Sequence, residues 1–253
     1  MSPRLSPEEN QKLFGAAASP FGHGHNYRAR LTFRSEQGGR DAALRPPSVP
    51  YQDITRCVES IRSELDHKNL NHEVAGLTNQ AITTENLACY IHERVRETLP
   101  LHRVRLHERA DFFAEYWQEG KYFLGLQLPF SAAHRLHSEK LPAKENVALY
   151  GKCNNPLGHG HLYLTEATIG GAFDERSGTL WDFGAFQKGI AEALEPWQNK
   201  HLNLELEEFR ESPSTGENIV NALWARFDSR LNGRLVRLRL YSRFPCSWRR
   251  DKY

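Results

Sequence analysis

The chain has 253 residues, 39% of them hydrophobic and 25% charged, which is ordinary for a soluble globular protein of one or two domains. Lysine and arginine (33) nearly cancel aspartate and glutamate (31), so charge gives no case for nucleic acid or a membrane surface as a partner. No apolar stretch approaches the roughly 20 residues that span a bilayer, and the N-terminus lacks the apolar core of a signal peptide. We therefore expect a cytoplasmic protein. The four cysteines form no Cys-x-x-Cys pair, which argues against a disulfide framework or a zinc ribbon.

The first half of the chain alternates segments with strand and helix patterns. A strand is predicted over residues 26–34, and helices over about 53–65 and over 85–98. The second helix follows Thr83-Thr84-Glu85-Asn86, where a threonine before a Glu-containing turn is a typical N-cap. Alternation of apolar and polar residues then predicts strands over 102–108 and 112–117.

The second half repeats this pattern after one additional strand. The additional strand covers residues 122–134, and it is followed by a strand at 162–169, helices at 183–194 and 217–231, and a strand at 235–241. Motifs recur as well, because the Gly-His-Gly-His sequence that ends at His25 returns as one that ends at His161. A length difference in the linker 37–50 accounts for the change in spacing between early and late motifs. We therefore expect two tandem units, residues 1–119 and 120–253, the first without a counterpart of the 122–134 strand.

A candidate metal centre lies in the second unit. His159 and His161 are one residue apart at the start of a strand, so their side chains project from the same face and offer two imidazole ligands. His134, at the end of the additional strand, is a third potential ligand, and Cys153 in the intervening Gly/Asn/Pro turn is a candidate base or nucleophile. The first unit repeats the doublet as His23 and His25 but has no third ligand, which favours a structural role for that pair.

The motifs, taken in order, resemble those of the 6-pyruvoyl-tetrahydropterin synthase family of the tunnelling-fold superfamily, once in each half. They are Leu65-Asp66-His67-Lys68-Asn69-Leu70, Thr83-Thr84-Glu85-Asn86, Phe130-Ser131-Ala132-Ala133-His134 and the segment from Gly151 through Cys153 to His161. The resemblance implies an α+β fold with two tandem units, each an antiparallel sheet backed by two helices. It further implies that these units close into a multi-subunit β-barrel in a homo-oligomer, which binds a small-molecule pterin and catalytic zinc (Zn2+).

The resemblance also implies roles for particular residues. The family's zinc ligands fall on His134, His159 and His161, and three imidazoles leave one tetrahedral position open, as at a catalytic zinc. Its catalytic cysteine falls on Cys153, and the Asp-His pair that assists this base falls on Asp66 and His67. The carboxylate that anchors the pterin falls on Glu108, and the residues that meet the pterin edge fall on Thr83, Thr84 and Glu85. Glu85 has an alternative role at the N-terminus of its helix.

The two units have lost complementary parts of this site. The first has Ala17 in the place of Cys153 and lacks the third zinc ligand, whereas the second has Gln198-Asn199 in place of the Asp-His pair and Leu240 in place of Glu108. We therefore expect one composite site shared by the two repeats. Decay of both copies into a non-catalytic protein is the alternative.

The function implied is 6-pyruvoyl-tetrahydropterin synthase activity, a zinc-dependent carbon–oxygen lyase reaction of tetrahydrobiopterin biosynthesis. It removes triphosphate from 7,8-dihydroneopterin triphosphate and rearranges the side chain by internal redox chemistry. Two alternatives stay open: the 6-carboxy-tetrahydropterin synthase reaction of the queuosine pathway, and a non-catalytic pterin-binding or purine-like ligand carrier. The spacing between Cys153 and His159 favours the first reaction.

Overall fold

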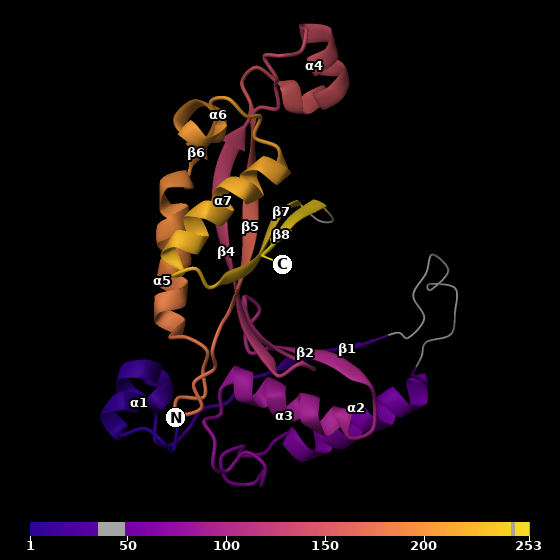
Figure 1. Ribbon diagram of the computed structural model, residues 1–253, viewed down its shortest axis with the longest axis vertical. Helices are drawn as coiled ribbons and strands as arrows, with labels where there is room; N and C mark the ends of the chain where they lie inside the picture. Colours follow the sequence, from indigo (N-terminus) through magenta and orange to yellow (C-terminus); the bar gives the residue numbers. More distant parts are fainter. Residues whose placement is uncertain (35–48, 244–245, 253) are drawn as a thin grey trace. The chain divides into compact units, whose positions relative to one another are not determined.

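The computed structural model of the protein describes residues 1–34, 49–243 and 246–252 (Figure 1). The linker predicted at 37–50 lies outside the described residues except for its last two positions. The chain folds as two units, Met1–Leu124 with Gly170–Asp182, and Gly125–Ile169 with Phe183–Tyr253. The segment Gly170–Asp182 therefore belongs to the second repeat in sequence but folds with the first unit.

The first unit is built on antiparallel strands in the order β1-β2-β3-β4. Its elements are α1 (Pro7–Phe14), a 3-10 turn (Gly15–Ala18), β1 (Arg28–Phe33), α2 (Tyr51–Leu65), α3 (Thr84–Arg96), β2 (Leu101–His107), β3 (Phe112–Trp117) and the beginning of β4 (Lys121–His134). In the β1–β2 ladder Arg28 lies opposite His107, and in the β2–β3 ladder Arg103 lies opposite Trp117. The helix α3 packs against β2 and β3 and buries Ile91 and Val95 there.

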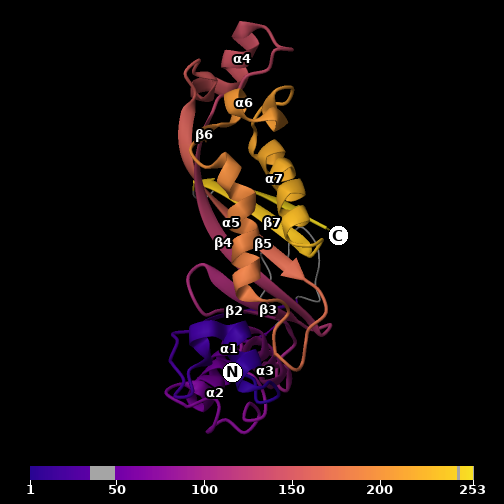
Figure 2. The same ribbon diagram turned by 90° about the vertical axis from the view of Figure 1, so that its left-hand side faces the viewer.

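The second unit has strands in the order β4-β5-β7-β8, with the short β6 parallel to β4. After β4 its elements are α4 (Ala143–Tyr150), a 3-10 turn (Gly151–Asn154), β5 (His159–Gly170), α5 (Phe183–Leu194), a 3-10 turn (Glu195–Trp197), β6 (Lys200–His201), α6 (Leu202–Glu205), a 3-10 turn (Glu207–Phe209), α7 (Gly216–Arg230), β7 (Leu235–Arg243) and β8 (Cys246–Asp251). The helices α5 and α7 lie side by side along the strands (Figure 2). Their apolar faces form a core around Phe186, Leu223 and Phe227, which are fully buried.

The observed elements confirm most of the sequence predictions. The α+β architecture with antiparallel strands and helices is as expected, and the helix predicted over 183–194 coincides with α5. Thr83 and Thr215 cap α3 and α7, because each side-chain oxygen accepts a hydrogen bond from the backbone N–H three residues later. Among the described residues the first unit has no strand before β1, so β4 has no counterpart there.

Two strands were not predicted, the two-residue β6 and the longer β8. The strand β8 pairs antiparallel with β7, with Trp248 opposite Leu240. Its sequence, Cys-Ser-Trp-Arg-Arg-Asp, has too little apolar alternation to indicate a strand, and pairing with β7 provides the stabilisation that the local sequence lacks.

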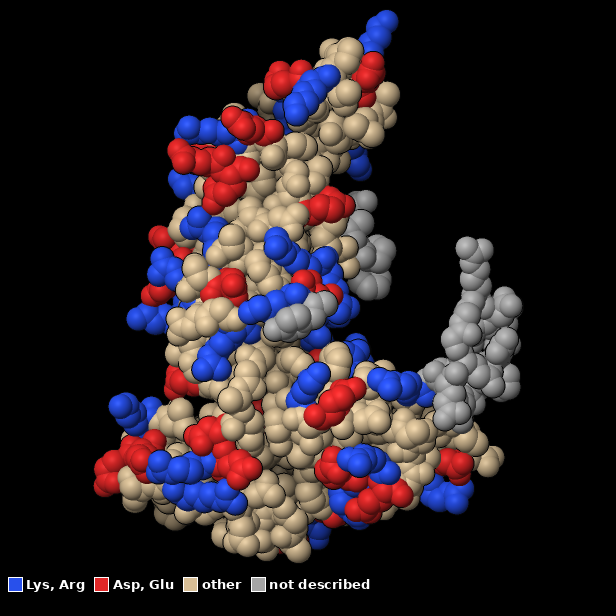
Figure 3. All heavy atoms as spheres, in the orientation of Figure 1, with Lys and Arg blue, Asp and Glu red and all other residues tan. Residues whose placement is uncertain are grey.

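In the part of the chain that the structure describes, no helix combines the length and the apolar character needed to cross a membrane. On the face drawn in Figure 3, lysine and arginine side chains are interspersed with aspartate and glutamate rather than gathered in a field of one sign. This mixture agrees with the nearly balanced charge of the sequence.

Candidate functional site

Three histidines of the second unit converge as a candidate metal centre. His134 ends β4, while His159 and His161 are the first and third residues of the neighbouring β5. One potential ligand atom from each residue lies within 4.8 Å of those of the other two. The ring centroids are 4.6 Å apart for His134 and His159, 5.1 Å for His134 and His161, and 4.8 Å for His159 and His161. The predicted ligands thus meet at one place.

The surroundings of His134 and His159 favour their neutral form, which is the form that binds a metal. Burial, with a smaller effect of the neighbouring imidazoles, lowers the pKa of His134 to about 4, and burial together with Lys152 lowers the pKa of His159. His134 donates a hydrogen bond from Nδ1 to the backbone carbonyl of Ser214 at 2.8 Å, which leaves Nε2 to face its neighbours. The Nδ1 atom of His159 is buried with no hydrogen-bond partner among the described residues. Neutral imidazoles with unpaired nitrogens suit Zn2+.

Gly158 shapes the turn that leads into this cluster. Its φ of +72° lies in the left-handed region, which glycine adopts without strain. A Cβ atom there would lie 2.6 Å from Nε2 of His201 and 3.0 Å from the backbone oxygen of His134. Only glycine therefore fits between the turn, His201 and the end of β4.

Cys153 lies in the 3-10 turn that follows α4, and its thiol is free and half-buried. The turn is fastened to the chain just beyond His134, because the N–H of Leu136 donates to the carbonyl of Cys153 at 2.9 Å. Asn154 adds a second link, from its Nδ2 atom to the carbonyl of Leu136 at 2.6 Å. The sequence segment that carries the predicted base is thus anchored next to the strand that ends in a predicted ligand.

Asp66 and His67 lie in the first unit, at the end of α2. The Nδ1 atom of His67 is 3.0 Å from Oδ1 of Asp66, whose Oδ2 accepts a hydrogen bond from Arg62. Partial desolvation raises the pKa of Asp66. The charge of His67 and the hydrogen bonds from Arg62 and His67 outweigh it, so the pKa is lowered overall. The Asp66 carboxylate and the His67 imidazole are thus within hydrogen-bonding distance of each other.

The counterparts in the second repeat are held differently. His67 and Asn199 share the same left-handed backbone, with φ of 59° and 61°. The N–H of Asn199 donates to the carbonyl of Ser131 in β4, and the side chain of Gln198 accepts from the N–H of Ser131. The first repeat has no strand equivalent to β4 within its described residues, and the His67 side chain is 93% exposed.

Glu108, the predicted pterin anchor, lies immediately after β2 and contacts one other predicted substrate-binding residue, Thr84. Thr84 donates its hydroxyl hydrogen to a carboxylate oxygen of Glu108, and Nδ1 of His25 lies 3.7 Å from the other oxygen. Burial and the charge of Glu108 raise the pKa of Tyr27. The carboxylate is partly exposed, so it has protein partners on one side and solvent on the other.

Thr83 and Glu85 bind the segment Gly170–Asp182. Thr83 donates to the carbonyl of Gly178, while Glu85 accepts hydrogen bonds from the hydroxyl of Thr179 and, at 3.1 Å, from the N–H of Leu180. Burial raises the pKa of Glu85, and the two donors oppose that rise. A loop of the second repeat thus closes over the start of α3, a contact that motif positions alone did not reveal.

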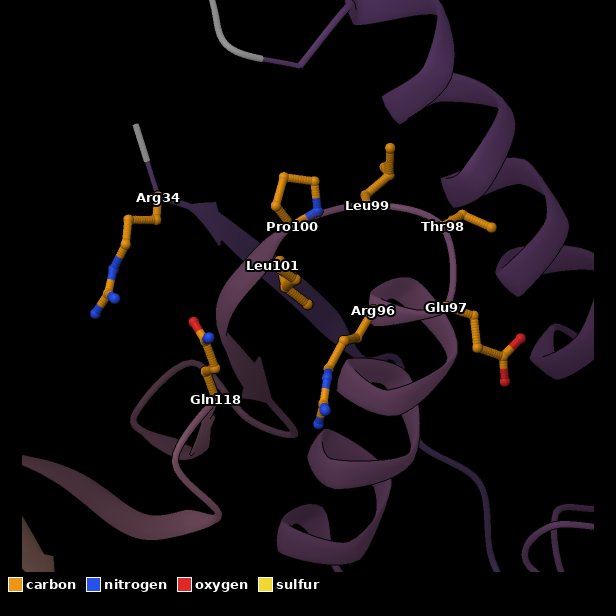
Figure 4. A pocket seen from close by; sticks show the side chains of 8 residues that line it. All are labelled: Arg34, Arg96, Glu97, Thr98, Leu99, Pro100, Leu101 and Gln118. Atoms are coloured by element: carbon orange, nitrogen blue, oxygen red, sulfur yellow. The ribbon is translucent and has the colours of Figure 1, made fainter. Parts of the chain in front are cut away.

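A separate hollow of about 580 Å³ lies at the other end of α3. Figure 4 shows the side chains of Arg34, Arg96 and Gln118 around it. It contains none of the residues predicted to hold zinc or pterin, and α3 separates it from Thr84 by the length of the helix.

Comparison with known proteins explains this arrangement. The sequence model of the family described as 6-pyruvoyl tetrahydropterin synthase matches residues 4–119 and matches again at residues 125–249. The chain belongs to this family. The two matches agree with a tandem duplication, and each covers about the length of one repeat.

Individual relatives match about one repeat. The 6-pyruvoyl tetrahydrobiopterin synthase of Homo sapiens is 36% identical over 117 residues, which are 46% of this chain and 81% of the human protein. The enzyme of that name from Drosophila melanogaster is 39% identical over 103 residues, 40% of this chain and 61% of its own length. The structure of Caenorhabditis elegans 6-pyruvoyl tetrahydropterin synthase superposes with a TM-score of 0.50 at 30% identity, covering 52% of this chain and 95% of that chain.

Proposed function

We propose that the chain is a zinc-dependent carbon–oxygen lyase of the 6-pyruvoyl-tetrahydropterin synthase type, acting in tetrahydrobiopterin biosynthesis. Its substrate would be 7,8-dihydroneopterin triphosphate, from which it eliminates triphosphate while the side chain undergoes internal redox rearrangement. The observation that carries the proposal is the convergence of His134, His159 and His161 at one place in a chain of this family.

Different residues of the chain would perform different parts of the reaction. His134, His159 and His161 would hold the zinc, which when bound supplies a Lewis acid that polarises the substrate's side-chain oxygen. Cys153 would accept the proton from the adjacent carbon, and His67, oriented by Asp66, would pass protons to and from solvent. No external reductant is needed, because the two electrons and two hydrogens that the side chain loses reduce the C6–N5 double bond of the dihydropterin ring. Elimination of triphosphate leaves the terminal side-chain carbon as a methyl group.

The pterin ring would be held by the first repeat. Glu108 can accept two hydrogen bonds from the amino group and ring N–H of a pterin, since a carboxylate binds such a pair bidentately. Thr84 positions the Glu108 carboxylate, and the backbone near Thr83 would meet the ring edge. Glu85 supports this end by ordering the Gly170–Asp182 loop.

We further propose that residues 1–119 and 120–253 are the two repeats and that they share one composite site. The complementary losses in the sequence support this division, because Cys153 and the zinc ligands lie in one repeat while Asp66, His67 and Glu108 lie in the other. A homo-oligomer in which repeats of several chains close into a β-barrel would bring such halves together, since unpaired strand edges need partners.

Identification of the product tests the proposal. Purified zinc-loaded protein would be incubated with 7,8-dihydroneopterin triphosphate, and we expect 6-pyruvoyl-tetrahydropterin and free triphosphate. Formation of 6-carboxy-tetrahydropterin alone would instead assign the queuosine-pathway reaction. Bound pterin without turnover or zinc would assign a carrier and contradict the enzymatic proposal.

A further inference from the structure

The place in the second repeat that corresponds to the pterin anchor has a different construction from that in the first. Thr84 begins α3 and contacts Glu108 after β2, whereas Gly216 begins α7 and Leu240 occupies the corresponding place in β7. Neither Gly216 nor Leu240 has a side chain that accepts hydrogen bonds. The loss of the carboxylate and the loss of the threonine therefore occur together.

The indole of Trp248 fills the space above Gly216. A Cβ atom added to Gly216 would lie 1.9 Å from Cε2, 2.0 Å from Cδ2 and 2.4 Å from Cζ2 of Trp248. These three atoms belong to the fused part of the indole, so the ring stands where a threonine side chain such as that of Thr84 would lie. Trp248 is also the residue opposite Leu240 in the β7–β8 ladder.

The same indole has a polar partner at the start of α7. Its Nε1–H donates to Oε1 of Glu217 at 3.0 Å, and Glu217 is the counterpart of Glu85. A flat bicyclic ring with an N–H group bound to a carboxylate has the chemistry that a pterin anchor selects. In the second repeat the indole of Trp248 lies over Gly216, the counterpart of Thr84, and opposite Leu240, the counterpart of Glu108.

We propose that Trp248 closes the ligand end of the second repeat from within, so that each chain has one pterin anchor, built around Glu108. This inference rests on the proposed pterin binding. Three residues surround the indole: Gly216 leaves room for it, Leu240 lies opposite Trp248 in the β7–β8 ladder, and Glu217 accepts a hydrogen bond from its N–H.

Equilibrium binding of neopterin to the zinc-loaded chain tests the number of anchors. We expect one neopterin per chain, and we expect Glu108→Gln to weaken binding at least about tenfold, because the amide cannot accept both hydrogen bonds. The matched control is Glu211→Gln, at an exposed glutamate of the second repeat, which should leave affinity and stoichiometry unchanged. Two neopterins per wild-type chain, or full binding by the Glu108→Gln variant, would overturn the closure.

A gain of a second site provides the complementary test. Combining Gly216→Thr, Leu240→Glu and Trp248→Ala should raise the stoichiometry from one to two neopterins per chain. The double variant Gly216→Thr with Leu240→Glu, which retains the indole, should stay at one. A folded triple variant, judged by circular dichroism and zinc content, that still binds one neopterin would contradict the proposal.

Free indole separates failure of this inference from failure of the proposed function. If the wild-type chain bound no neopterin, the pterin function would be wrong, but the hollow left by Trp248→Ala should still bind indole and recover thermal stability. Adding Gly216→Thr should abolish that recovery, because the threonine side chain occupies the ring's place. Recovery that is absent, or equal with and without Gly216→Thr, would show that the indole does not occupy the position assigned to it.

Discussion

The Nδ1 atom of His134 donates a hydrogen bond to the backbone carbonyl of Ser214, 80 residues further along the chain, at 2.8 Å. Ser214 directly precedes Thr215, the N-cap of α7, so the start of this helix determines which imidazole nitrogen faces His159 and His161. The side chain of Ser214 also bonds to Asn203 at 3.0 Å, which holds the carbonyl in position. His134 of the candidate metal centre is thus oriented by the residue that precedes the N-cap of a helix, and that helix contributes none of the predicted ligands.

The burial of neutral His134 predicts a pH dependence of stability in zinc-free protein. The pKa of His134 is lowered from 6.5 to about 4 in the folded chain, so between these values the unfolded chain binds a proton that the folded chain does not. The free energy of unfolding should therefore fall as the pH drops from about 6.5 to about 4, by on the order of 3 kcal/mol at most. Urea unfolding across this range would measure it. The His134→Gln variant is the control, and an unchanged slope in that variant would show that another group is responsible.

Zinc content distinguishes the two histidine doublets. We expect one zinc per chain by elemental analysis after dialysis, and we expect His159→Ala to lose it because two imidazoles no longer enclose the ion. His23→Ala, the same substitution in the first repeat, should retain full zinc. Catalytically active protein without zinc, or equal loss in the two variants, would contradict the assignment of the ligands.

A methyl group at Gly158 should disturb the same centre. Gly158→Ala places Cβ against His201 and the carbonyl of His134, so zinc affinity should fall by on the order of tenfold. Gly22 has the same φ of +72° but nothing within 4 Å of an added Cβ, so Gly22→Ala tests backbone strain alone. That variant should lose about 1 kcal/mol of stability and keep its zinc affinity. Equal zinc affinities in the two variants would refute the role of crowding at Gly158.

The two helix N-caps should differ in their contribution to stability. Thr215→Ala removes one capping hydrogen bond and should cost about 1 kcal/mol. Thr83→Ala removes the cap and also the hydrogen bond to the carbonyl of Gly178, so we expect a cost of about 2 kcal/mol. Chemical denaturation of both variants measures the difference. A Thr83→Ala cost no larger than that of Thr215→Ala would mean that the Gly178 contact contributes little.

Mixing of inactive chains tests the composite site. Cys153→Ala and Asp66→Asn should each abolish turnover, because each removes a different part of the proton-transfer chain. If halves of the site meet across chains, dissociating the two variants together and reassembling them should restore up to about a quarter of wild-type activity, as random pairing predicts. Reassembled wild-type protein is the control for the procedure. Recovered control activity without complementation would place both halves in one chain.

Local sequence patterns were sufficient for most of the fold and for the three histidines of the candidate metal centre. The positions of α3, α5 and α7 follow from helical periodicity and threonine caps, and the Gly-His-Gly-His doublet places two imidazoles on one face of β5 because strand side chains alternate. The comparison of the two halves predicted the missing strand before β1. These features depend on residues close together in sequence, where steric and hydrogen-bonding preferences act directly.

Other features depend on contacts between distant segments, and only the tertiary structure decided them. Three such contacts join residues more than 30 positions apart. They are the hydrogen bond from His134 to the carbonyl of Ser214, the hydrogen bonds from the loop Gly170–Asp182 to Glu85, and the packing of the Trp248 indole over Gly216. No local pattern encodes such pairs, because a glycine, a backbone carbonyl or a strand tryptophan has the same local preference whatever packs against it. The sequence by itself thus identified His134, His159 and His161 as candidate metal ligands and, through the family resemblance, predicted Glu108 as the pterin anchor. The packing of α7 against the end of β4 sets the orientation of His134. The packing of β8 against α7 places the indole of Trp248 at the start of that helix.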